Sequence, residues 1–368
     1  MSDYKIVTRK KYEKNLREFP GYVQNYFSKM QSFGSSISTL WDYSLDYKMF
    51  FNFLMAEGLT TSTTIRDIPL SELEKLTVDD TEKFIIMLRN RKSSKAKKND
   101  PEKFEYSEVT IARKISSLRS LFAYLNEREY LSKNIWEKTE VKVPKTTPAA
   151  RAASLRKKLL VAEEIKEFIE FVAAGYLAKC DSQKKEIPYL FNRERDAAIV
   201  ALLLGSGIRL SELVGLNLDD IDYINQEVKV VRKGNFVDNP TFADTAKHYL
   251  QEYEKVRGKY RPERNESAFF LSVPNKFIMT RTIPNSSGSR IGRRAVQDLI
   301  LKYAEAFDNK KITPHSLRHA FASEFNRRNP NLSELRDQLG HSDTKTTERY
   351  AHANLDSKKR SVKSILNF

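Results

Sequence analysis

The stretch from residue 312 to residue 352 constrains the fold and the chemistry of this chain more than any other part of the sequence. Thr313-Pro314 predicts the start of a helix, because Thr caps a helix well and Pro fits the first helical position. His315 and Arg318 follow three residues apart, so they share one face of that helix near its positive end. A helix start that carries His and Arg predicts a binding site for an anion.

The same stretch predicts two further helices and a reactive turn between them. The segment 332–339 is expected to form a helix that ends at Gly340, a typical C-cap residue. His341 follows at once in the turn, and a third, short helix is expected to carry Tyr350. This part of the chain therefore offers two histidines, one arginine and one tyrosine for a single site.

The charge of the chain indicates the kind of partner that such a site serves. The formal net charge is +16 and the pI is about 9.5, which favours a polyanion, most simply nucleic acid, over a merely basic protein. The only cysteine, Cys180, excludes an internal disulfide and suits a reducing cytoplasm. We find no signal peptide and no membrane-spanning stretch. The expected location is the cytoplasm, in association with the nucleoid.

Five sequence motifs together resemble those of the tyrosine site-specific recombinases, the phage-integrase family, and within it the Xer type. The motifs are Gly207-Ile208-Arg209-Leu210-Ser211-Glu212-Leu213, Lys233-Gly234, His315 with Arg318, Leu339-Gly340-His341, and Tyr350, nine residues beyond His341. Each motif is weak alone, but all five stand in the order and at the spacing of that family. The resemblance is strong over residues 160–355 and only general in the N-terminal part.

The resemblance implies a metal-free transesterification on a DNA phosphodiester, with no cofactor. The implied roles are Tyr350 as nucleophile, Arg209, Arg318 and His341 as donors to the phosphate oxygens, His315 as proton acceptor, Lys233 as general acid and Glu212 as an orienting group. The product is a 3′-phosphotyrosine and a free 5′-hydroxyl, and a second 5′-hydroxyl can reverse the step without ATP. The remaining His of the same helix, His319, is expected to be buried and structural.

An acidic cluster, Asp219, Asp220 and Asp222, raises the alternative of a metal-dependent nuclease. No second acidic cluster and no set of His ligands follows it in the sequence. We therefore expect loop and helix-cap roles for these acids, and no metal site.

The pattern of apolar residues predicts a mainly α protein of two domains. The boundaries are a helical domain at 1–143, a basic linker at 144–160, a mostly helical α/β domain with a small antiparallel sheet at 161–353, and an amphipathic C-terminal helix at 354–368. The resemblance implies that the first domain binds DNA, that the second is catalytic, and that the C-terminal helix docks into a neighbouring subunit; docking on the chain's own core is the alternative. Helical periodicity favours helices near 38–58, 78–88, 107–128, 163–172, 192–204, 211–216, 244–260 and 295–307, and alternation favours strands at 226–233 and 269–271.

Clusters of basic residues outside these motifs are interpreted as contacts with the DNA backbone. The predicted contact residues are Arg89, Arg91, Lys92, Lys95, Arg113, Lys114, Lys145, Arg290 and Arg293. A solvated charged surface is the alternative for the loop 89–106 and for the helix start near Arg293.

The predicted function is recombination at a specific duplex site by a homotetramer on two DNA sites, with resolution of chromosome dimers and a septal DNA translocase as a candidate partner. A mobile-element integrase with the same chemistry is the first alternative. A type IB topoisomerase and a non-catalytic, sequence-specific DNA-binding protein are the others; the last would tolerate Tyr350→Phe.

Overall fold

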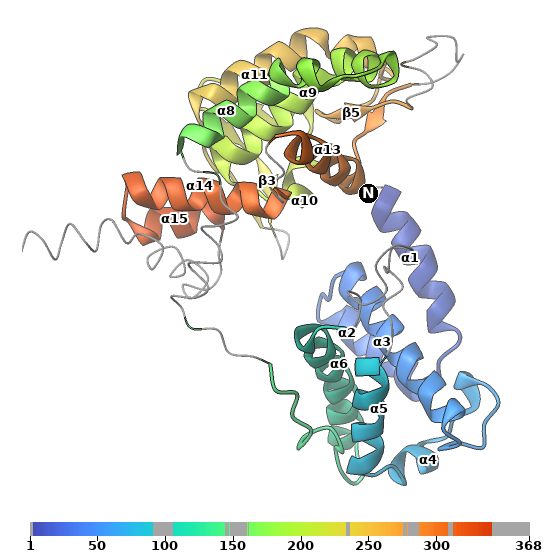
Figure 1. Ribbon diagram of the computed structural model, residues 1–368. Helices are drawn as coiled ribbons and strands as arrows, with labels where there is room; N and C mark the ends of the chain where they lie inside the picture. The colour runs from blue at the N-terminus through green and yellow to red at the C-terminus, as the bar shows by residue number, and fades with distance from the viewer. Residues whose placement is uncertain are drawn as a thin grey trace, which may run out of the picture. The chain divides into compact units, whose positions relative to one another are not determined.

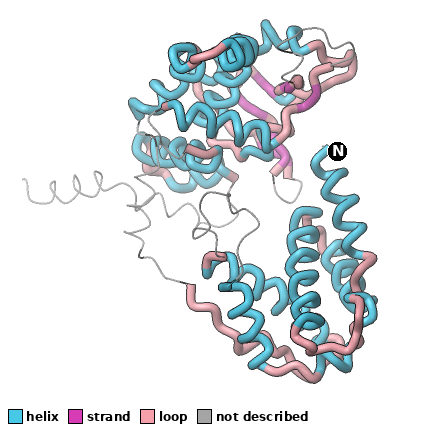
Figure 2. The backbone as a smooth tube through the Cα atoms, turned by 45° about the vertical axis from the view of Figure 1, so that its right-hand side comes forward, coloured by secondary structure: helices cyan, strands magenta, loops and turns pink. Residues whose placement is uncertain are grey.

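The computed structural model describes residues 3–90, 106–143, 147, 160, 162–232, 236–274, 278, 287–307 and 312–340. The chain divides into two units, Met1–Lys145 and Thr146–Phe368. The division falls inside the segment predicted as the linker, 144–160. The predicted fold class is confirmed: the described residues are mostly helical, with short antiparallel strand pairs in the second unit (Figures 1 and 2).

The first unit is a bundle of helices around an aromatic core. The elements are α1 (Asp3–Leu16), α2 (Gly21–Ser32), α3 (Ile37–Ala56), η1 (Ile65–Asp67), α4 (Leu70–Glu74), α5 (Val78–Asn90) and α6 (Glu108–Glu127). Phe50 on α3 lies at the centre, with ring centroids 5.3 Å from Phe84 on α5 and 5.4 Å from Trp136. Edge-to-face packing of this kind adds to the free energy gained by burying the rings.

The sequence predicted the later helices of this unit better than the first two. Ser107 caps α6 by accepting a hydrogen bond from the Thr110 amide, close to the predicted start. The N-cap of α3 is Ser36, two residues before the predicted start at Ser38. No signal predicted α1 and α2, because the polar residues of this stretch mask the few apolar ones; α2 still buries Val23, Tyr26 and Phe27.

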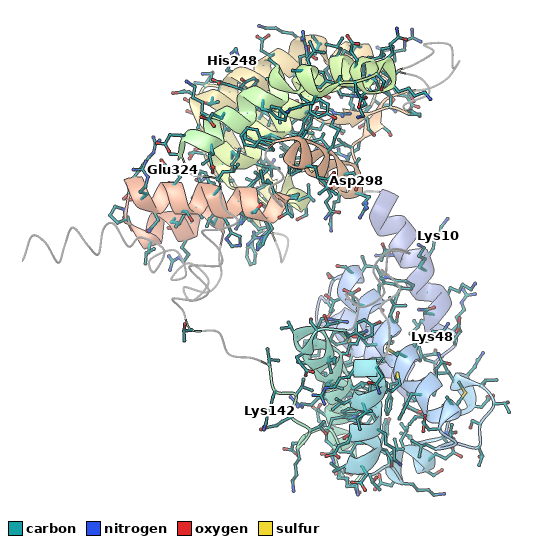
Figure 3. All side chains as sticks on the ribbon, viewed as in Figure 1. Lys10, Lys48, Lys142, His248, Asp298 and Glu324 are labelled. Carbon is teal, nitrogen blue, oxygen red and sulfur yellow. The ribbon has the colours of Figure 1, made fainter. Side chains whose placement is uncertain are left out.

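The second unit is built around one buried helix. The elements before its hairpins are α8 (Ala162–Ala173), η3 (Gly175–Lys179), α9 (Gln183–Ser206), α10 (Leu210–Leu213) and η4 (Leu218–Asp220). Those after them are α11 (Asp244–Val256), η5 (Arg257–Tyr260), α13 (Arg293–Ala306), α14 (Pro314–Arg328) and α15 (Leu332–Leu339). Helix α9 packs against α8, α11 and α14, and its residues from Ala197 to Leu204 are all buried. Figure 3 marks Asp298 on α13 and Glu324 on α14.

Three antiparallel strand pairs complete the second unit. They are β1 (Ile221–Asp222) with β2 (Glu227–Val228), β3 (Val230–Val231) with β4 (Val237–Asp238), and β5 (Leu271–Ser272) with β6 (Ser289–Arg290). The single strand predicted over 226–233 is thus two short strands with different partners. The break lies at Lys229, whose amide donates to the Asp220 carbonyl outside the strand ladder.

Helices α14 and α15 form a small hairpin with its own apolar contacts. Ala322 of α14 and the α15 residues Leu335 and Leu339 are fully buried together, with Phe321 and Phe325 packed against them. Both predicted boundaries hold: Thr313 caps α14, and α15 ends at Gly340 in the left-handed conformation, φ 59°. This packing fixes the direction in which the last turn of α15 presents its carbonyl groups.

Candidate active site

A glycine turn brings the first predicted arginine to the site. Helix α9 ends at Ser206, and Gly207 follows with φ 66°, where only glycine is unstrained. A Cβ on Gly207 would lie 2.3 Å from Phe321 Cδ1, so the turn can approach α14 only because the side chain is absent. Arg209, two residues later, is the N-cap of α10.

Glu212 holds Arg209 from both sides. The Arg209 amide donates to Glu212 Oε2 at 2.7 Å, and Arg209 Nη1 donates to Oε1 at 2.8 Å. The Glu212 side chain is 2% exposed, whereas that of Arg209 is 36% exposed. The buried carboxylate therefore orients a guanidinium that still reaches solvent.

The second predicted arginine, Arg318, is buried on the first turns of α14. Its Nη1 donates to the Gly207 carbonyl, and its Nη2 donates to the Leu339 carbonyl at 2.7 Å. These bonds join the end of α9, the start of α14 and the end of α15. Carbonyl oxygens orient a guanidinium without cancelling its charge.

The C-terminal end of α15 is where these side chains meet. Gly340 O accepts from Arg209 Nη2 at 3.2 Å, one residue beyond the Leu339 carbonyl that accepts from Arg318. The last carbonyls of a helix carry partial negative charge and attract cations. The structure thus brings Arg209 and Arg318 to one place, directly before His341 in the sequence.

His315 lies exposed on the first turn of α14, and it contacts a second histidine. Its Nε2 is 2.9 Å from His319 Nε2, four residues on. The prediction that His319 is buried is wrong, since its ring is partly exposed and touches His315. The sequence signal was the spacing itself, because residues i and i+4 share one face of a helix.

Several predicted site residues lie outside the described residues. They are Lys233, His341 and Tyr350 of the predicted catalytic set, and Arg91, Lys92, Lys95 and Lys145 of the predicted DNA contacts. The C-terminal helix predicted at 354–368 also lies outside them.

Two of the remaining predicted DNA contacts are committed to the protein itself. Lys114 is buried and donates to Asp46 Oδ1 at 2.7 Å. Arg290 donates from Nη1 to the carbonyls of Val214 and Leu216 at 3.0 and 2.8 Å, and from Nη2 to Asn217 Oδ1. We correct both predictions: these side chains stabilise the fold, because their donors point to internal acceptors.

The other predicted DNA contacts remain at the surface. Arg89 donates from two nitrogens to the Glu108 carboxylate, and its side chain is 48% exposed. Arg113 donates from Nη2 alone to the Asp46 carboxylate, and its side chain is also 48% exposed. Arg293 lies exposed on the first turn of α13. Exposed guanidiniums of this kind can reach a phosphate, so for these three residues DNA contact stays a prediction.

The acids proposed for the alternative metal site have local roles. Asp220 accepts from the Asn217 amide at 2.8 Å, and Asp222 accepts from the amides of Ile224 and Asn225. Across the residues that the structure describes, no cluster of three His, Cys, Asp or Glu side chains could hold a metal ion. The cap and loop roles predicted for Asp220 and Asp222 are confirmed.

The thiol of Cys180 is not activated for catalysis. Burial raises its pKa, which makes it a poorer nucleophile at neutral pH.

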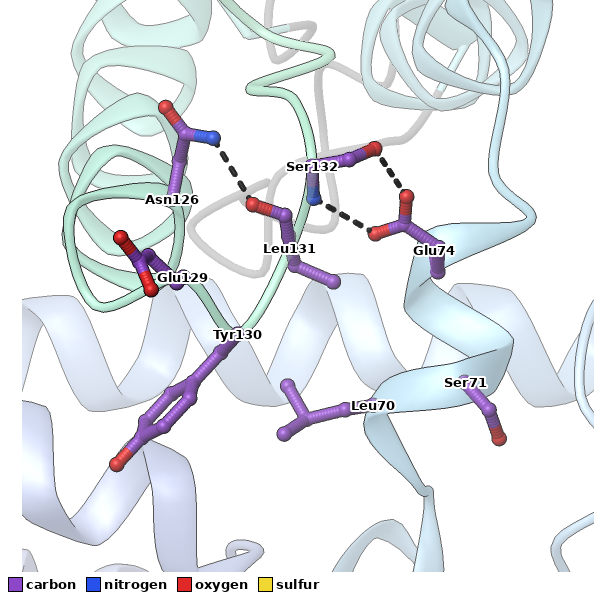
Figure 4. Close-up of a pocket in the computed structure, with 8 residues that line it drawn as sticks. All are labelled: Leu70, Ser71, Glu74, Asn126, Glu129, Tyr130, Leu131 and Ser132. Atoms are coloured by element: carbon purple, nitrogen blue, oxygen red, sulfur yellow. Dashed lines mark hydrogen bonds between the residues drawn. The ribbon is translucent and has the colours of Figure 1, made fainter.

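A pocket of about 500 Å³ in the first unit is lined by residues of α4, α6 and the loop after α6 (Figure 4). Its carboxylate Glu74 already accepts from the Ser132 amide and hydroxyl.

Comparison with known proteins decides the family. Residues 180–356 match the phage integrase family. The XerS tyrosine recombinase of Streptococcus gordonii is 36% identical over 354 residues, which cover 94% of this chain and 95% of that protein. The chain belongs to the tyrosine recombinase family. The predicted enzyme class is therefore confirmed, and XerS of Streptococcus pyogenes serotype M1 matches at the same identity and coverage.

Solved structures of tyrosine recombinases share the fold. The XerH recombinase bound to its difH substrate, in a pre-cleavage complex, matches with a TM-score of 0.58 and 17% identity, covering 91% of this chain and 82% of that one. The Tn1549 transposon integrase with a circular intermediate DNA matches with a TM-score of 0.58 and 18% identity, covering 94% of this chain and 99% of that one.

In the part of this recombinase that the structure describes, no helix has the length and apolarity to cross a bilayer.

Proposed function

We propose that this tyrosine recombinase cuts and rejoins duplex DNA at a specific site and resolves chromosome dimers, as an Xer-type enzyme. One observation carries the proposal: Arg209 and Arg318 converge on the end of α15, directly before His341, in a chain with 36% identity to XerS over nearly its whole length. The net charge of +16 supports a DNA partner.

The proposed chemistry is attack by the phenol of Tyr350 on a phosphodiester. The Tyr350 oxygen forms a bond to phosphorus while the bond from phosphorus to the 5′ oxygen breaks. His315 accepts the phenolic proton, and Lys233 donates a proton to the leaving 5′ oxygen. The products are a 3′-phosphotyrosine and a 5′-hydroxyl, and attack by another 5′-hydroxyl reverses the step.

The two arginines supply the main stabilisation of the transition state. Negative charge grows on the non-bridging oxygens as the phenol attacks, and preoriented guanidinium donors meet that charge. His341 adds a further donor. Positive charge held in place by carbonyl oxygens and by Glu212 can serve here in place of a divalent ion.

The proposed assembly is a homotetramer that joins two DNA sites, with a septal DNA translocase as activating partner. The exposed arginines Arg89, Arg113 and Arg293 are proposed contacts with the DNA backbone, together with Arg91, Lys92, Lys95 and Lys145. The proposed location is the cytoplasm, at the nucleoid.

The decisive experiment traps the covalent intermediate on a nicked suicide substrate that carries a candidate chromosomal site. We expect a protein–DNA adduct on a denaturing gel, in the presence of EDTA, and its loss in Tyr350→Phe. Tyr130→Phe is the matched control, because Tyr130 is an exposed tyrosine of the first unit, and it should form the adduct normally. An adduct that requires magnesium, or that survives Tyr350→Phe, would refute the proposed chemistry.

A further inference from the structure

Arg232 is a buried arginine next to the predicted general acid, and the sequence motifs give it no role. It lies just after β3, one residue before Lys233, and its side chain is 6% exposed. Its Nε donates to Asp238 Oδ2 on β4 at 2.8 Å. Its backbone amide donates to the Phe236 carbonyl at 2.8 Å, which closes the base of the β3–β4 hairpin.

The guanidinium of Arg232 also reaches the end of α15. Nη1 donates to the Leu339 carbonyl and Nη2 donates to the Gln338 carbonyl, both at 2.9 Å. A Cβ on Gly340 would lie 2.5 Å from Arg232 Nε, so the guanidinium packs directly on the C-cap. One side chain therefore fastens the hairpin to the turn that precedes His341.

Arg232 shares its acceptors with both arginines of the site. Glu212 accepts from Arg209 through Oε1 and from Arg232 Nη1 through Oε2, the latter at 3.3 Å. The Leu339 carbonyl accepts from both Arg318 and Arg232. The planar, multi-donor fork of arginine suits such a junction, and a lysine ammonium cannot reproduce these directions at once. The hairpin base is thus held in register with the groups proposed to bind the phosphate.

We propose that Arg232 is a positioning residue for Lys233: it holds the hairpin base against the end of α15, so that Lys233 protonates the leaving 5′ oxygen. The inference rests on the proposed function, in which Lys233 is the general acid. Arg232 directly precedes Lys233 in the chain, so the anchor that the structure describes is covalently joined to the proposed acid. A purely structural arginine would instead affect stability alone.

The test compares an oxygen and a sulfur leaving group in suicide substrates that are otherwise identical. An alkyl thiol, with a pKa of roughly 8.5, leaves as the thiolate and needs no general acid. Single-turnover cleavage is measured at saturating protein. We expect Arg232→Lys to cleave the oxygen substrate about 10²-fold more slowly than wild type, and the sulfur substrate at close to the wild-type rate.

Two further variants are measured in the same assay. Lys233→Ala should show the same selective rescue by sulfur, since it removes the acid itself. Asp238→Asn weakens only the hairpin side of the junction and should give a smaller defect with the same rescue. It also keeps the test open if Arg232→Lys fails to fold.

The matched control is Arg257→Lys. Arg257 also donates to backbone carbonyls of the second unit, those of Glu266, Ala268 and Phe269. Its replacement should lower the unfolding midpoint and leave the ratio of oxygen to sulfur cleavage at the wild-type value.

The outcomes separate the two proposals. If wild type forms the Tyr350 adduct but Arg232→Lys slows both substrates equally, or neither, the inference about Arg232 is wrong while the proposed function stands. Absence of sulfur rescue in Lys233→Ala would likewise overturn the inference. If wild type forms no adduct with either substrate, the proposed function fails, and the inference falls with it.

Discussion

Two buried carboxylates, Asp46 in the first unit and Glu212 in the second, each collect basic side chains, and they do so differently. Asp46 on α3 accepts from Arg113 at 2.9 Å, from Lys114 at 2.7 Å and from Ser117 at 3.1 Å, all on α6. The side chains of this group close on one another and join two helices. The arrangement is that of a structural ion cluster.

The second group consists of Glu212 with Arg209, Arg232 and Arg318, and its arginines also bond to atoms away from the carboxylate. Arg209 and Arg232 bond to Glu212, but both also donate to carbonyls at the end of α15, and Arg318 joins them there. Backbone carbonyls fix the direction of a guanidinium at little cost to its charge. The two groups differ in where their bonds lead: those of Asp46 link α3 to α6, whereas those of the Glu212 group lead to the end of α15, directly before His341 in the sequence.

The largest effect should come from Arg209→Lys. A lysine keeps the charge but loses the fork that Glu212 orients, so single-turnover cleavage should fall by about 10²–10³-fold. The rate is measured with protein in excess over the suicide substrate. Arg113→Lys is the control from the other cluster and should cleave at the wild-type rate once DNA is saturated. An equal fall in the cleavage rate of both variants would show that the two clusters do not differ in function.

The Asp46 cluster is tested through stability, with Asp46→Ala. This variant should destabilise the first unit by about 3 kcal/mol, because it leaves Lys114 buried without its carboxylate. Urea unfolding, followed by tryptophan fluorescence, measures the change; Trp136 reports on this unit. Cleavage by the folded fraction should be unchanged. A variant as stable as wild type would show that the Asp46 cluster contributes no net stability.

A smaller effect separates the two cations of the Asp46 cluster. The Arg113 side chain is 48% exposed and that of Lys114 is 9% exposed. Arg113→Ala should reduce the slope of log K against log salt concentration for DNA binding by about 1, whereas Lys114→Met should keep the wild-type slope. Fluorescence anisotropy over a salt series measures both. A reduced slope in Lys114→Met would reinstate the DNA contact that its burial argues against.

The smallest effect concerns Glu324 on α14, which is labelled in Figure 3. Its carboxylate forms ion pairs with Arg327 and Arg328 at the surface. The hydrogen bond from Arg327 is the main reason that the pKa of Glu324 is lowered. A lowered pKa stabilises the fold above the pKa of the unfolded chain, and this contribution disappears as pH falls through the folded value. Glu324→Gln should therefore cost under about 1 kcal/mol at pH 7, and thermal melts should show this cost shrinking as the pH is lowered towards 3. A constant difference across that range would contradict the assignment.

The sequence predicted the parts of the fold that depend on local signals. Thr313-Pro314 and Gly340 act over one helical turn, and the structure confirms both boundaries. The start of α9 was predicted at Asn192, nine residues late, because the amphipathic first turns and Pro188 hide the helix. Local pattern also could not show that one apparent strand pairs with two different partners.

The site divides in the same way. The motif spacing located Arg209, Arg318 and Glu212, which the fold then brings together across more than a hundred residues. It could not show that Lys114 and Arg290 point inward, since the identity of a basic residue does not reveal whether its partner is a phosphate or an acceptor within the protein. Arg232 was missed for that reason too: its partners are carbonyls and acids distant in sequence.

The close approach of Gly340 to the guanidinium of Arg232 has a consequence for evolution. A side chain at position 340 would occupy the space that Arg232 fills, and it would also have to adopt a left-handed backbone. Position 340 can therefore gain a side chain only beside a shorter residue at 232, and even then it must adopt a strained backbone. Among relatives, a residue other than glycine at position 340 should appear only where position 232 carries a shorter residue, although 108 positions separate the two in the chain.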